Sequence, residues 1–431
     1  MVDMEVLVSL CKRRGFIYQS SEIYGGINGF WDFGPVGCEL KRRIKDSWWR
    51  RMVQERDDVV GLDTSIIAHP QIWIASGHVA SFNDPMVDCK QCKRRFRTDE
   101  IPADNTGKCP ECGGELTDAR EFNLMFQTHV GATADNASIA YLRPETCQSI
   151  FTQFKNVQTS TRQKVPFGIA QIGKAFRNEI TPRNFIFRSR EFEQMEMEFF
   201  CHKDEADKWF DFWVNDRHQW FKDIGIKPER LRIRPHQHHE LAHYAKACMD
   251  VEYEMPFGWS EMEGIANRTD YDLNNHMRES GKDLTYFDEA RKEKFIPYVI
   301  ETSIGVDRTA LAILADAYRE EEVRGETRVV MGFHPSIAPV QVGVLPLSNK
   351  LKDQAKRLET DLRRQFRTMY DDAGSIGRRY RRHDEIGTPF CLTYDIDSEN
   401  DHAVTVRDRD SMQQDRVPME KVAEHLNGKF K

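Results

Sequence analysis

The stretch from Pro166 to His202 constrains the fold more than any other part of the sequence. Two runs of alternating residues flank the polar segment TPRN, and this pattern predicts two antiparallel strands joined by a turn. Alternation places one set of side chains on the front of this hairpin: Gly173, Ala175, Arg177 and Glu179 on the first arm, and Phe192, Gln194, Glu196 and Glu198 on the second. The opposite face is apolar. An arginine can hold a phosphate through two N–H donors and an aromatic ring can stack on a base, so the front suits an anionic ligand with a flat ring. A solvated sheet face with surface ion pairs is the alternative.

The residues FRNE at 176–179 and the later pattern Arg188-x-x-x-Phe192 resemble motif 2 of the class II aminoacyl-tRNA synthetases, in the form found in homodimeric glycyl-tRNA synthetases. The resemblance implies that Arg177 holds the α-phosphate of ATP and is catalytic, and that Glu179 reads the adenine amino group. It also implies that Arg188 reaches the γ-phosphate and that Phe192 stacks under the base.

A long amphipathic segment precedes the hairpin. From Val36 to Gln54, apolar residues recur at every fourth position with basic residues between them, which predicts a helix. The following VVGLDTSIIAHP reads as a strand that ends at Pro70. Helix and strand together resemble motif 1, which builds the dimer interface in this family, so the resemblance implies a homodimer. A helix that only covers its own core would show the same periodicity.

Four cysteines form the most specific pattern that needs no family knowledge. Cys89-x-x-Cys92 and Cys109-x-x-Cys112 have the spacing of a structural zinc site with four thiolate ligands. Such a site leaves no open coordination position, so it predicts a scaffold, here a zinc ribbon over residues 86–117. Basic residues beside the first pair suit either the acceptor stem of a tRNA or an ordinary solvated surface. Arg97 resembles the family position that contacts the amino-acid substrate.

The segment YLRPETCQSIF supplies a further carboxylate. Pro144 ends a strand and Glu145 lies at the start of the next helix, where a carboxylate is favourable. A helix-start residue without a further role would look the same. The resemblance makes this a substrate loop in which Glu145 faces the amino acid.

The segment PYVIETSIGVDRTALAILADAY predicts a strand that runs into a helix. Alternation places Glu301, Ser303 and Gly305 on one face of the strand. Arg308 falls in the first helical turn, whose end is already positive, and a nearby anion would resolve that conflict. This stretch resembles motif 3, whose arginine lies over the adenine and meets a phosphate, so Arg308 is the second expected catalytic residue.

The resemblance implies two groups of site residues. For ATP they are Arg177, Asn178, Glu179, Phe187, Arg188, Ser189, Arg190, Glu191, Phe192, Glu261, Met262, Gly305, Val306, Asp307 and Arg308. For glycine they are Arg97, Glu145, Phe192, Glu193, Gln194, Met195, Glu196, Glu301, Thr302, Ser303, Ile304 and Gly305. Three carboxylates in one small site need a cation between them, which suits the ammonium group of glycine. Mg²⁺ is expected with ATP, and Glu263 is a candidate ligand.

The segment His239-Glu240-Leu241-Ala242-His243 matches the zinc-peptidase pattern H-E-x-x-H. The pattern arises easily by chance and no third ligand stands at a known spacing. We expect a solvated helix here.

The C-terminal part alternates strand and helix from VQVGVLPL onward, which predicts a separate α/β domain. It resembles the anticodon-binding domain shared by the glycyl, threonyl, prolyl and histidyl enzymes. Basic residues exceed acidic ones between Lys350 and Arg382, although the whole chain has a net charge of −7. A tRNA partner requires such a local basic face. Candidate anticodon contacts are Arg378, Arg379, Arg381 and Arg382.

These observations predict an α+β protein with an antiparallel-sheet class II catalytic domain at residues 1–335. We expect a zinc-ribbon insertion at 86–117, a helical insertion at about 203–257 and an anticodon-binding α/β domain at 336–431. With 39% hydrophobic residues, no apolar run of membrane-spanning length and mostly scattered cysteines, we expect a cytoplasmic enzyme without a membrane segment.

The resemblance implies that the chain joins glycine and ATP and charges tRNA-Gly. Two alternatives stay open: a class II synthetase for threonine, proline or histidine, and a non-catalytic relative that binds nucleic acid. Such relatives can lose catalytic residues, whereas Arg177, Glu179, Glu301 and Arg308 are all present here.

Overall fold

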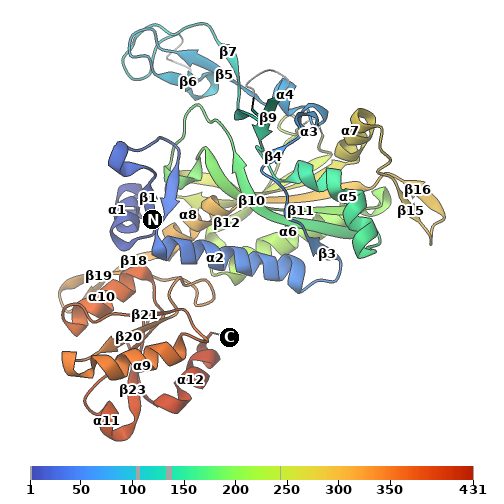
Figure 1. Cartoon of the computed structure of the whole chain (residues 1–431). Coiled ribbons are helices and arrows are strands. Elements are labelled where there is room, and N and C mark those ends of the chain that lie inside the picture. The colour runs from blue at the N-terminus through green and yellow to red at the C-terminus, as the bar shows by residue number, and fades with distance from the viewer. Residues whose placement is uncertain (1, 103–106, 133–137, 243, 431) are drawn as a thin grey trace.

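A seven-stranded sheet forms the centre of the larger part of the molecule (Figure 1). The computed structural model describes residues 2–102, 107–132, 138–242 and 244–430. The strand order is β12-β13-β14-β17-β11-β10-β3, and every pairing is antiparallel except that between β10 and β3. The bounds are β3 Val59–Gly61, β10 Phe167–Phe176, β11 Glu191–Cys201, β12 Leu231–Pro235, β13 Ala247–Met255, β14 Gly258–Thr269 and β17 Tyr298–Gly305. The predicted α+β fold with an antiparallel core sheet is confirmed.

The predicted hairpin is formed by β10 and β11, which lie between β17 and the edge strand β3. Gly173 lies opposite Gln194 and Ala175 opposite Phe192, so the front-face residues of the two arms meet as alternation predicts. β10 ends at Phe176. Arg177 and Glu179 therefore lie in the connecting segment and not on the strand.

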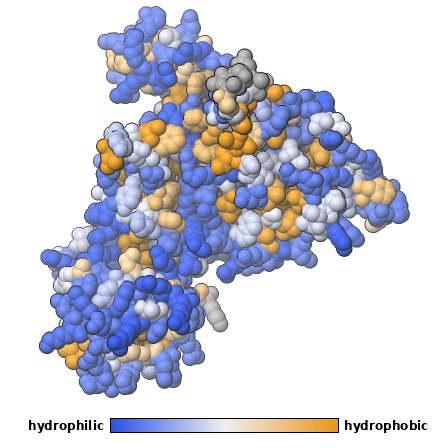
Figure 2. All heavy atoms as spheres, viewed as in Figure 1, coloured by the Kyte–Doolittle hydropathy of each residue, from blue (hydrophilic) through white to orange (hydrophobic). Residues whose placement is uncertain are grey.

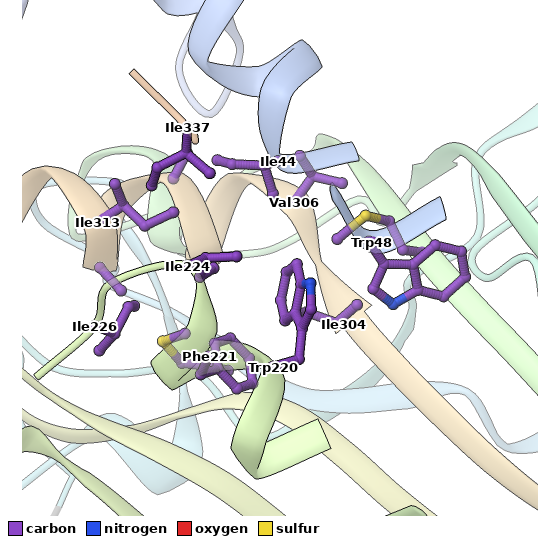
Figure 3. Close-up of a cluster of buried hydrophobic side chains, with 14 of the residues drawn as sticks. Ile44, Trp48, Trp220, Phe221, Ile224, Ile226, Ile304, Val306, Ile313 and Ile337 are labelled. Atoms are coloured by element: carbon purple, nitrogen blue, oxygen red, sulfur yellow. The ribbon is translucent and has the colours of Figure 1, made fainter. Parts of the chain in front are cut away.

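Three helices cover the back of the sheet: α2 Pro35–Trp49, α6 Ala206–Asp223 and α8 Val306–Ala317. The apolar residues that recur at every fourth position form the buried stripe of α2 and of the π-helical segment Arg50–Gln54 that continues it. They are Val36, Leu40, Ile44, Trp48 and Met52. Figure 3 shows Ile44 and Trp48 of this stripe in one cluster with Trp220 of α6, Ile304 of β17 and Ile313 of α8. Burial of each such side chain is worth about 1.5–3 kcal/mol, so this layer fixes the strands that carry the front-face residues.

Part of the front face is covered by α5 Cys147–Thr161 and α7 Tyr271–Ser280. Phe151 and Phe154 of α5 and Leu273 of α7 pack against Phe200 and Val299 of the sheet. The covered area includes the ends of β11 and β17 that lie away from the connecting segment of the hairpin.

Two expected elements differ from the structure. The segment 59–70 forms two short strands in different sheets, because Thr64 donates to the Gln171 side chain and turns the chain away. The segment 203–257 is helical only in α6. It then forms β12 and β13 at the sheet edge, so the expected helical insertion is wrong beyond α6.

The remaining elements of the larger part are short. They are α1 Met4–Arg14, β1 Ile17–Gln19, β2 Trp31–Phe33, β4 Ile67–Ala68, α3 Pro70–Ala75, α4 His78–Ser81, β8 Gln127–His129, β9 Ile139–Leu142, β15 Tyr286–Asp288, β16 Glu293–Phe295, β18 Tyr318–Val323 and β19 Glu326–Met331.

The cysteine-rich insertion projects from one end of the molecule (Figure 1). It contains a three-stranded sheet, β6-β5-β7, made of β5 Asn83–Asp88, β6 Arg95–Arg97 and β7 Arg120–Asn123. Its apolar core consists of Val87, Cys89, Cys109 and Leu116, with a few partly buried neighbours.

The C-terminal part has its own mixed sheet and its own core, as predicted. Strand order is β21-β20-β22-β23-β24, parallel at β20 and antiparallel from β22 onward. Its visible face is mostly hydrophilic (Figure 2). The bounds are β20 Val342–Pro346, α9 Lys352–Leu362, β21 Thr368–Tyr370, α10 Ile376–Ile386, β22 Phe390–Tyr394, α11 Ser398–Asp401, β23 Ala403–Asp408, β24 Gln414–Pro418 and α12 Val422–Lys429. In the described part of the chain, the helices are all too short or too polar to span a lipid bilayer.

Candidate active site

The first cavity of the front face lies between the hairpin, β14 and the start of α8. The predicted residues that line it are Arg177, Glu179, Phe187, Arg188, Ser189, Phe192, Gln194, Glu261, Met262, Ser303, Gly305, Asp307 and Arg308. The guanidinium of Arg177 lies 5.4 Å from the centre of the Phe192 ring, and that of Arg308 lies 4.5 Å from the centre of the Phe187 ring. The cavity thus combines arginines with flat rings, which suits an anion that carries a base.

Two backbone contacts hold these arginines in place. Arg177 donates through Nε to the carbonyl oxygen of Pro144 at 3.0 Å. Arg308 donates to the carbonyl oxygens of Phe187 and Glu261, at 3.3 and 3.2 Å. Each arginine is therefore positioned by a segment that is distant in sequence.

Four residues expected to contact ATP do not line this cavity: Asn178, Arg190, Glu191 and Val306. Arg190 donates to the carbonyl oxygens of Glu179 and Asn28, Glu191 pairs with Lys174, and Val306 is fully buried in the core.

A second cavity continues from the first, because both are lined by Arg177, Gln194, Glu261 and Ser303. Its inner wall contains the three carboxylates that were predicted to face glycine, Glu145, Glu196 and Glu301. They come from three elements: the loop before α5, β11 and β17.

Each carboxylate has its own set of donors. Glu196 accepts hydrogen bonds from the Thr146 backbone at 2.9 Å, the Thr146 hydroxyl, Gln194 at 3.0 Å and Ser303 at 2.6 Å. Glu145 accepts from Cys147 and Gln148 and lies 3.4 Å from Nε2 of His78.

The pKa values of these carboxyl groups differ. Burial favours the neutral form of Glu145, but His78 and Arg268 outweigh it and hold the pKa well below its usual value. Burial and the neighbouring Glu145 raise the pKa of Glu196. Burial raises the pKa of Glu301 to about 7, with Glu196 and Glu145 acting in the same direction and Arg268 against it. The wall carries excess negative charge, which a bound cation would relieve.

Glu198 lies beneath this wall, opposite Glu301 on the neighbouring strand. It is completely buried, and both of its oxygens lack a hydrogen-bond partner among the described residues. Burial and the charge of Glu301 raise its pKa well above the usual value. The neutral form of Glu198 is therefore favoured relative to that of an exposed glutamate.

Five residues expected at the glycine site lie elsewhere. Glu193, Met195, Thr302 and Ile304 point to the back of the sheet, as strand alternation requires; Glu193 pairs with Lys41 and Lys45 of α2. Arg97 is in the insertion, where it pairs with Asp84 and Asp99. Phe192 and Gly305 line the first cavity and not the second.

Arg268 is the main residue of this wall that the sequence analysis missed. It is buried on β14, donates to Glu301 at 3.0 Å and to Asp272 at 2.7 and 2.9 Å, and lies 3.9 Å from the centre of the Tyr244 ring. The signal available in the sequence was the alternation of Gly264, Ala266 and Arg268, in which small residues leave room beside one long cation.

Comparison with known proteins places this site in a family. The model described as "tRNA synthetase class II core domain (G, H, P, S and T)" matches residues 126–317, and that of the anticodon binding domain matches residues 341–429. Glycine–tRNA ligase of Caldanaerobacter subterraneus subsp. tengcongensis is 54% identical over 456 residues, which covers 100% of this chain and 99% of the relative. The chain belongs to the glycine–tRNA ligase family. The enzymes of that name from Treponema denticola and Acetivibrio thermocellus are each 53% identical, cover 100% and 99% of this chain, and are themselves covered to 98%.

Glu263, the candidate magnesium ligand of the sequence analysis, lines neither cavity. Glu263 is fully buried on the back of the sheet, where it accepts from Nε of Arg217 at 2.8 Å. A β-bulge is the reason, since Glu261 and Glu263 pair with the consecutive residues Glu252 and Val251. The two glutamates therefore face opposite sides, and only Glu261 reaches the cavity.

The H-E-x-x-H segment of this family member is not helical in its described part. Residues 238–240 form a turn, and His243 lies outside the described residues. Glu240 accepts from the Gln237 backbone and from Arg234. The expected helix is wrong, and the carboxylate of Glu240 is committed to these local contacts.

The four cysteines that were predicted as metal ligands meet in the insertion. Their sulfur atoms all lie within 4.8 Å of one another, and the Cys89–Cys112 and Cys92–Cys109 separations are 3.5 and 3.7 Å. Zn–S bonds of about 2.3 Å in a tetrahedron require sulfur separations of about 3.8 Å. The geometry therefore fits a structural zinc ion in this member of the glycine–tRNA ligase family.

Proposed function

We propose that this chain activates glycine with ATP to give glycyl-adenylate and pyrophosphate, and then transfers glycine to the 3′ end of tRNA-Gly. The observation that carries the proposal is the pair of joined cavities. One is lined by arginines and aromatic rings, and the other by three carboxylates. Arg177 lines both, as a group acting at the junction of two substrates must.

ATP occupies the first cavity in this proposal. Arg177 and Arg308 neutralise charge on the phosphates, Arg188 reaches the terminal phosphate, Glu179 reads the adenine and Phe192 stacks on it. The glycine carboxylate attacks the α-phosphorus, its new P–O bond forms, and pyrophosphate leaves with the electrons of the broken P–O bond. Positioning and charge neutralisation carry the reaction, so no covalent nucleophile is required.

Glycine occupies the second cavity, with its ammonium group between Glu145, Glu196 and Glu301. Gln194 and Ser303 both donate to the Glu196 carboxylate and thereby orient it. Nε2 of Gln194 also lies 3.4 Å from Oγ of Ser303. The side chain of a larger amino acid would have to displace the hydrogen-bonded side chains of this wall. Such steric exclusion suits an enzyme for glycine, because glycine has no side chain that the enzyme could bind.

Two metal ions belong to the proposal. Glu261 is the carboxylate beside Arg308 in the first cavity, 3.3 Å from its guanidinium, and it fits a ligand of Mg²⁺ that accompanies ATP. Zn²⁺ fits the four-cysteine cluster, where it would hold the insertion folded.

The partners and the location follow from less direct observations. We propose a homodimer formed through the segment around α2, and a tRNA surface that includes Arg378 and Arg381. Arg379 and Arg382 are poor candidates because Arg379 is buried against the Pro346 and Gly374 carbonyls and Arg382 pairs with Asp371. A cytoplasmic location is supported by the cysteines, since none of the ten forms a disulfide bond.

Glycine-dependent ATP–pyrophosphate exchange, followed by charging of tRNA, tests the proposal. We expect exchange with glycine and not with threonine, proline or histidine. RNA binding without any amino-acid-dependent exchange would favour a non-catalytic relative instead.

A further inference from the structure

The outer wall of the glycine cavity contains polar side chains that have no role in the proposed amino-acid activation. It is formed by His236, which follows β12, and by Cys248 and Asp250, which alternate on the front of β13. The backbone N–H of His236 donates to the carbonyl oxygen of Cys248 at 3.0 Å, so the histidine is held across from β13. These residues share one cavity with Glu196, Glu301 and Ser303.

His236 and Asp250 form a close pair. Nε2 of His236 lies 2.7 Å from Oδ2 of Asp250, which is only 4% exposed. With the proton on Nε2, the imidazole donates to the carboxylate and its Nδ1 keeps a lone pair. Among the described residues, Nδ1 of His236 has no hydrogen-bond partner. A carboxylate that orients an imidazole and stabilises its protonated form is the arrangement of a proton acceptor.

We propose that His236, oriented by Asp250, contacts the 3′-terminal ribose of tRNA and accepts the proton of the attacking hydroxyl group. The inference rests on the proposed function and concerns its second step. The ribose oxygen forms a bond to the carbonyl carbon of glycyl-adenylate, and the bond from that carbon to the phosphate oxygen breaks. The hydroxyl proton moves to Nδ1 of His236, and AMP leaves with the electron pair of the broken bond.

The other acceptors around the cavity are already engaged. Glu196 accepts four hydrogen bonds and Glu301 pairs with Arg268. Glu240 is held by Arg234 and by the Gln237 backbone. His236 is the residue of the described lining that combines a titratable nitrogen with a fixed orientation and no competing donor at that nitrogen.

The same three side chains are also of metal-ligand type, since one donor atom of each lies within 4.8 Å of the others. The guanidinium of Arg234 lies 3.6 Å from Asp250, and this positive charge opposes a cation there. A hydrogen-bonded pair accounts for the geometry without a metal.

The two half-reactions separate this inference from the proposed function. For the full-length His236→Ala and His236→Gln variants, we expect the single-turnover transfer of glycine from preformed adenylate to tRNA to slow by about 100-fold, the lower end of general-base contributions. Glycine-dependent exchange should change by less than about threefold, since His236 takes no part in activation. For Asp250→Asn we expect a smaller loss, again confined to transfer.

His239→Ala is the matched control, because this exposed histidine stands in the neighbouring turn and does not line the cavity. We expect it to leave both rates unchanged. Transfer at the unmodified rate in His236→Ala would overturn the inference, as would a parallel fall of exchange and transfer, which indicates a structural role. A second equivalent of bound zinc that disappears in Cys248→Ala would also overturn it in favour of a metal site. Absence of exchange in the unmodified chain would instead contradict the proposed function.

Discussion

At the scale of single residues, the glycine wall depends on Glu301. Its carboxylate accepts from the buried Arg268 at 3.0 Å and faces the cavity between Glu145 and Glu196. Replacing it by alanine removes a charge from the ammonium site and leaves the Arg268 guanidinium partly unpaired. A hydrogen bond to a charged group is worth about 1.5–3 kcal/mol, so we expect kcat/KM for glycine in pyrophosphate exchange to fall about 10- to 100-fold. Glu289→Ala, at an exposed glutamate, is the control, and near-normal exchange in Glu301→Ala would remove Glu301 from the site.

The pKa of Glu301 also predicts a pH dependence. Because that pKa is raised to about 7, the carboxyl group is neutral below this pH and ionised above it. An ionised Glu301 attracts the ammonium of glycine, so the KM for glycine should rise as the pH falls from about 8 to 6, by at most about tenfold per unit for a single proton. Glu145, whose pKa is held well below its usual value, stays ionised across this range.

The measurement is the KM for glycine in exchange at constant ionic strength, with Glu301→Gln as the partner variant. That variant should have weak binding and a flat profile between these pH values. A sloping profile in Glu301→Gln would assign the titration to another group, such as Glu196, whose pKa is also raised.

At the scale of elements, α2 is tied to the active-site strands by a buried ion-pair network. Nζ of Lys41 lies 2.8 Å from Asp307 at the start of α8 and 3.1 Å from Glu193 on β11, and Asp307 also accepts from the Glu193 backbone. The next residue on α8 is Arg308. The network therefore sets the position of the arginine that lies in the ATP cavity.

We predict that Lys41→Met raises the KM for ATP by about tenfold or more, the value of one or two hydrogen bonds to charged groups. The KM for glycine should change less, because the glycine wall does not contact this network. Arg42→Ala is the control, since Arg42 is exposed and pairs with Asp46 on its own helix. Equal changes in both KM values would indicate a general loss of structure.

The cysteine insertion is an element with too small a core to fold by itself. Among the described residues, the apolar cluster of the insertion contains four buried side chains, so the metal must supply much of the folding free energy. We predict that Cys109→Ser loses one equivalent of zinc, measured by elemental analysis, and that proteases then cut within residues 86–117. The main thermal transition should stay in place. Cys38→Ser, at an exposed cysteine of α2, is the control, and retention of full zinc by Cys109→Ser would contradict the assignment.

At the scale of the whole molecule, the sequence predicted those features that depend on local periodicity. The faces of β10, β11 and β17 and the buried stripe of α2 follow from the periods of strand and helix, so they were predictable. The place of Glu263 was not, because a single bulge at Met262 reverses the alternation. Arg268 was missed because its role depends on Glu301, which lies 33 residues further along the chain. Similarly, β12 and β13 were assigned to a helical insertion because their burial does not alternate residue by residue, so the sequence lacks the period of two that marks a strand.

The two large parts of the molecule are joined by buried charges. Asp384 on α10 is 1% exposed and accepts from Arg328 of β19 at 2.8 Å and from Arg407 of β23 at 2.9 Å. Arg409 extends the junction, since it donates to the carbonyl oxygen of Phe333 at 2.9 Å. One carboxylate thus compensates guanidinium groups from both parts.

We predict that Asp384→Asn destabilises this junction by about 3–5 kcal/mol, because it leaves buried guanidinium groups without their counter-charge. Asp384 belongs to neither of the apolar cores of the two parts, so the substitution leaves the side chains of both cores unchanged. Unfolding should therefore change from one transition to two, with the C-terminal part melting first, as calorimetry can measure. Asp353→Asn is the control, because Asp353 lies in the first turn of α9, away from the junction. A single transition at the unmodified temperature in Asp384→Asn would mean that apolar contacts such as those of Ile337 and Ile386 alone hold the two parts together.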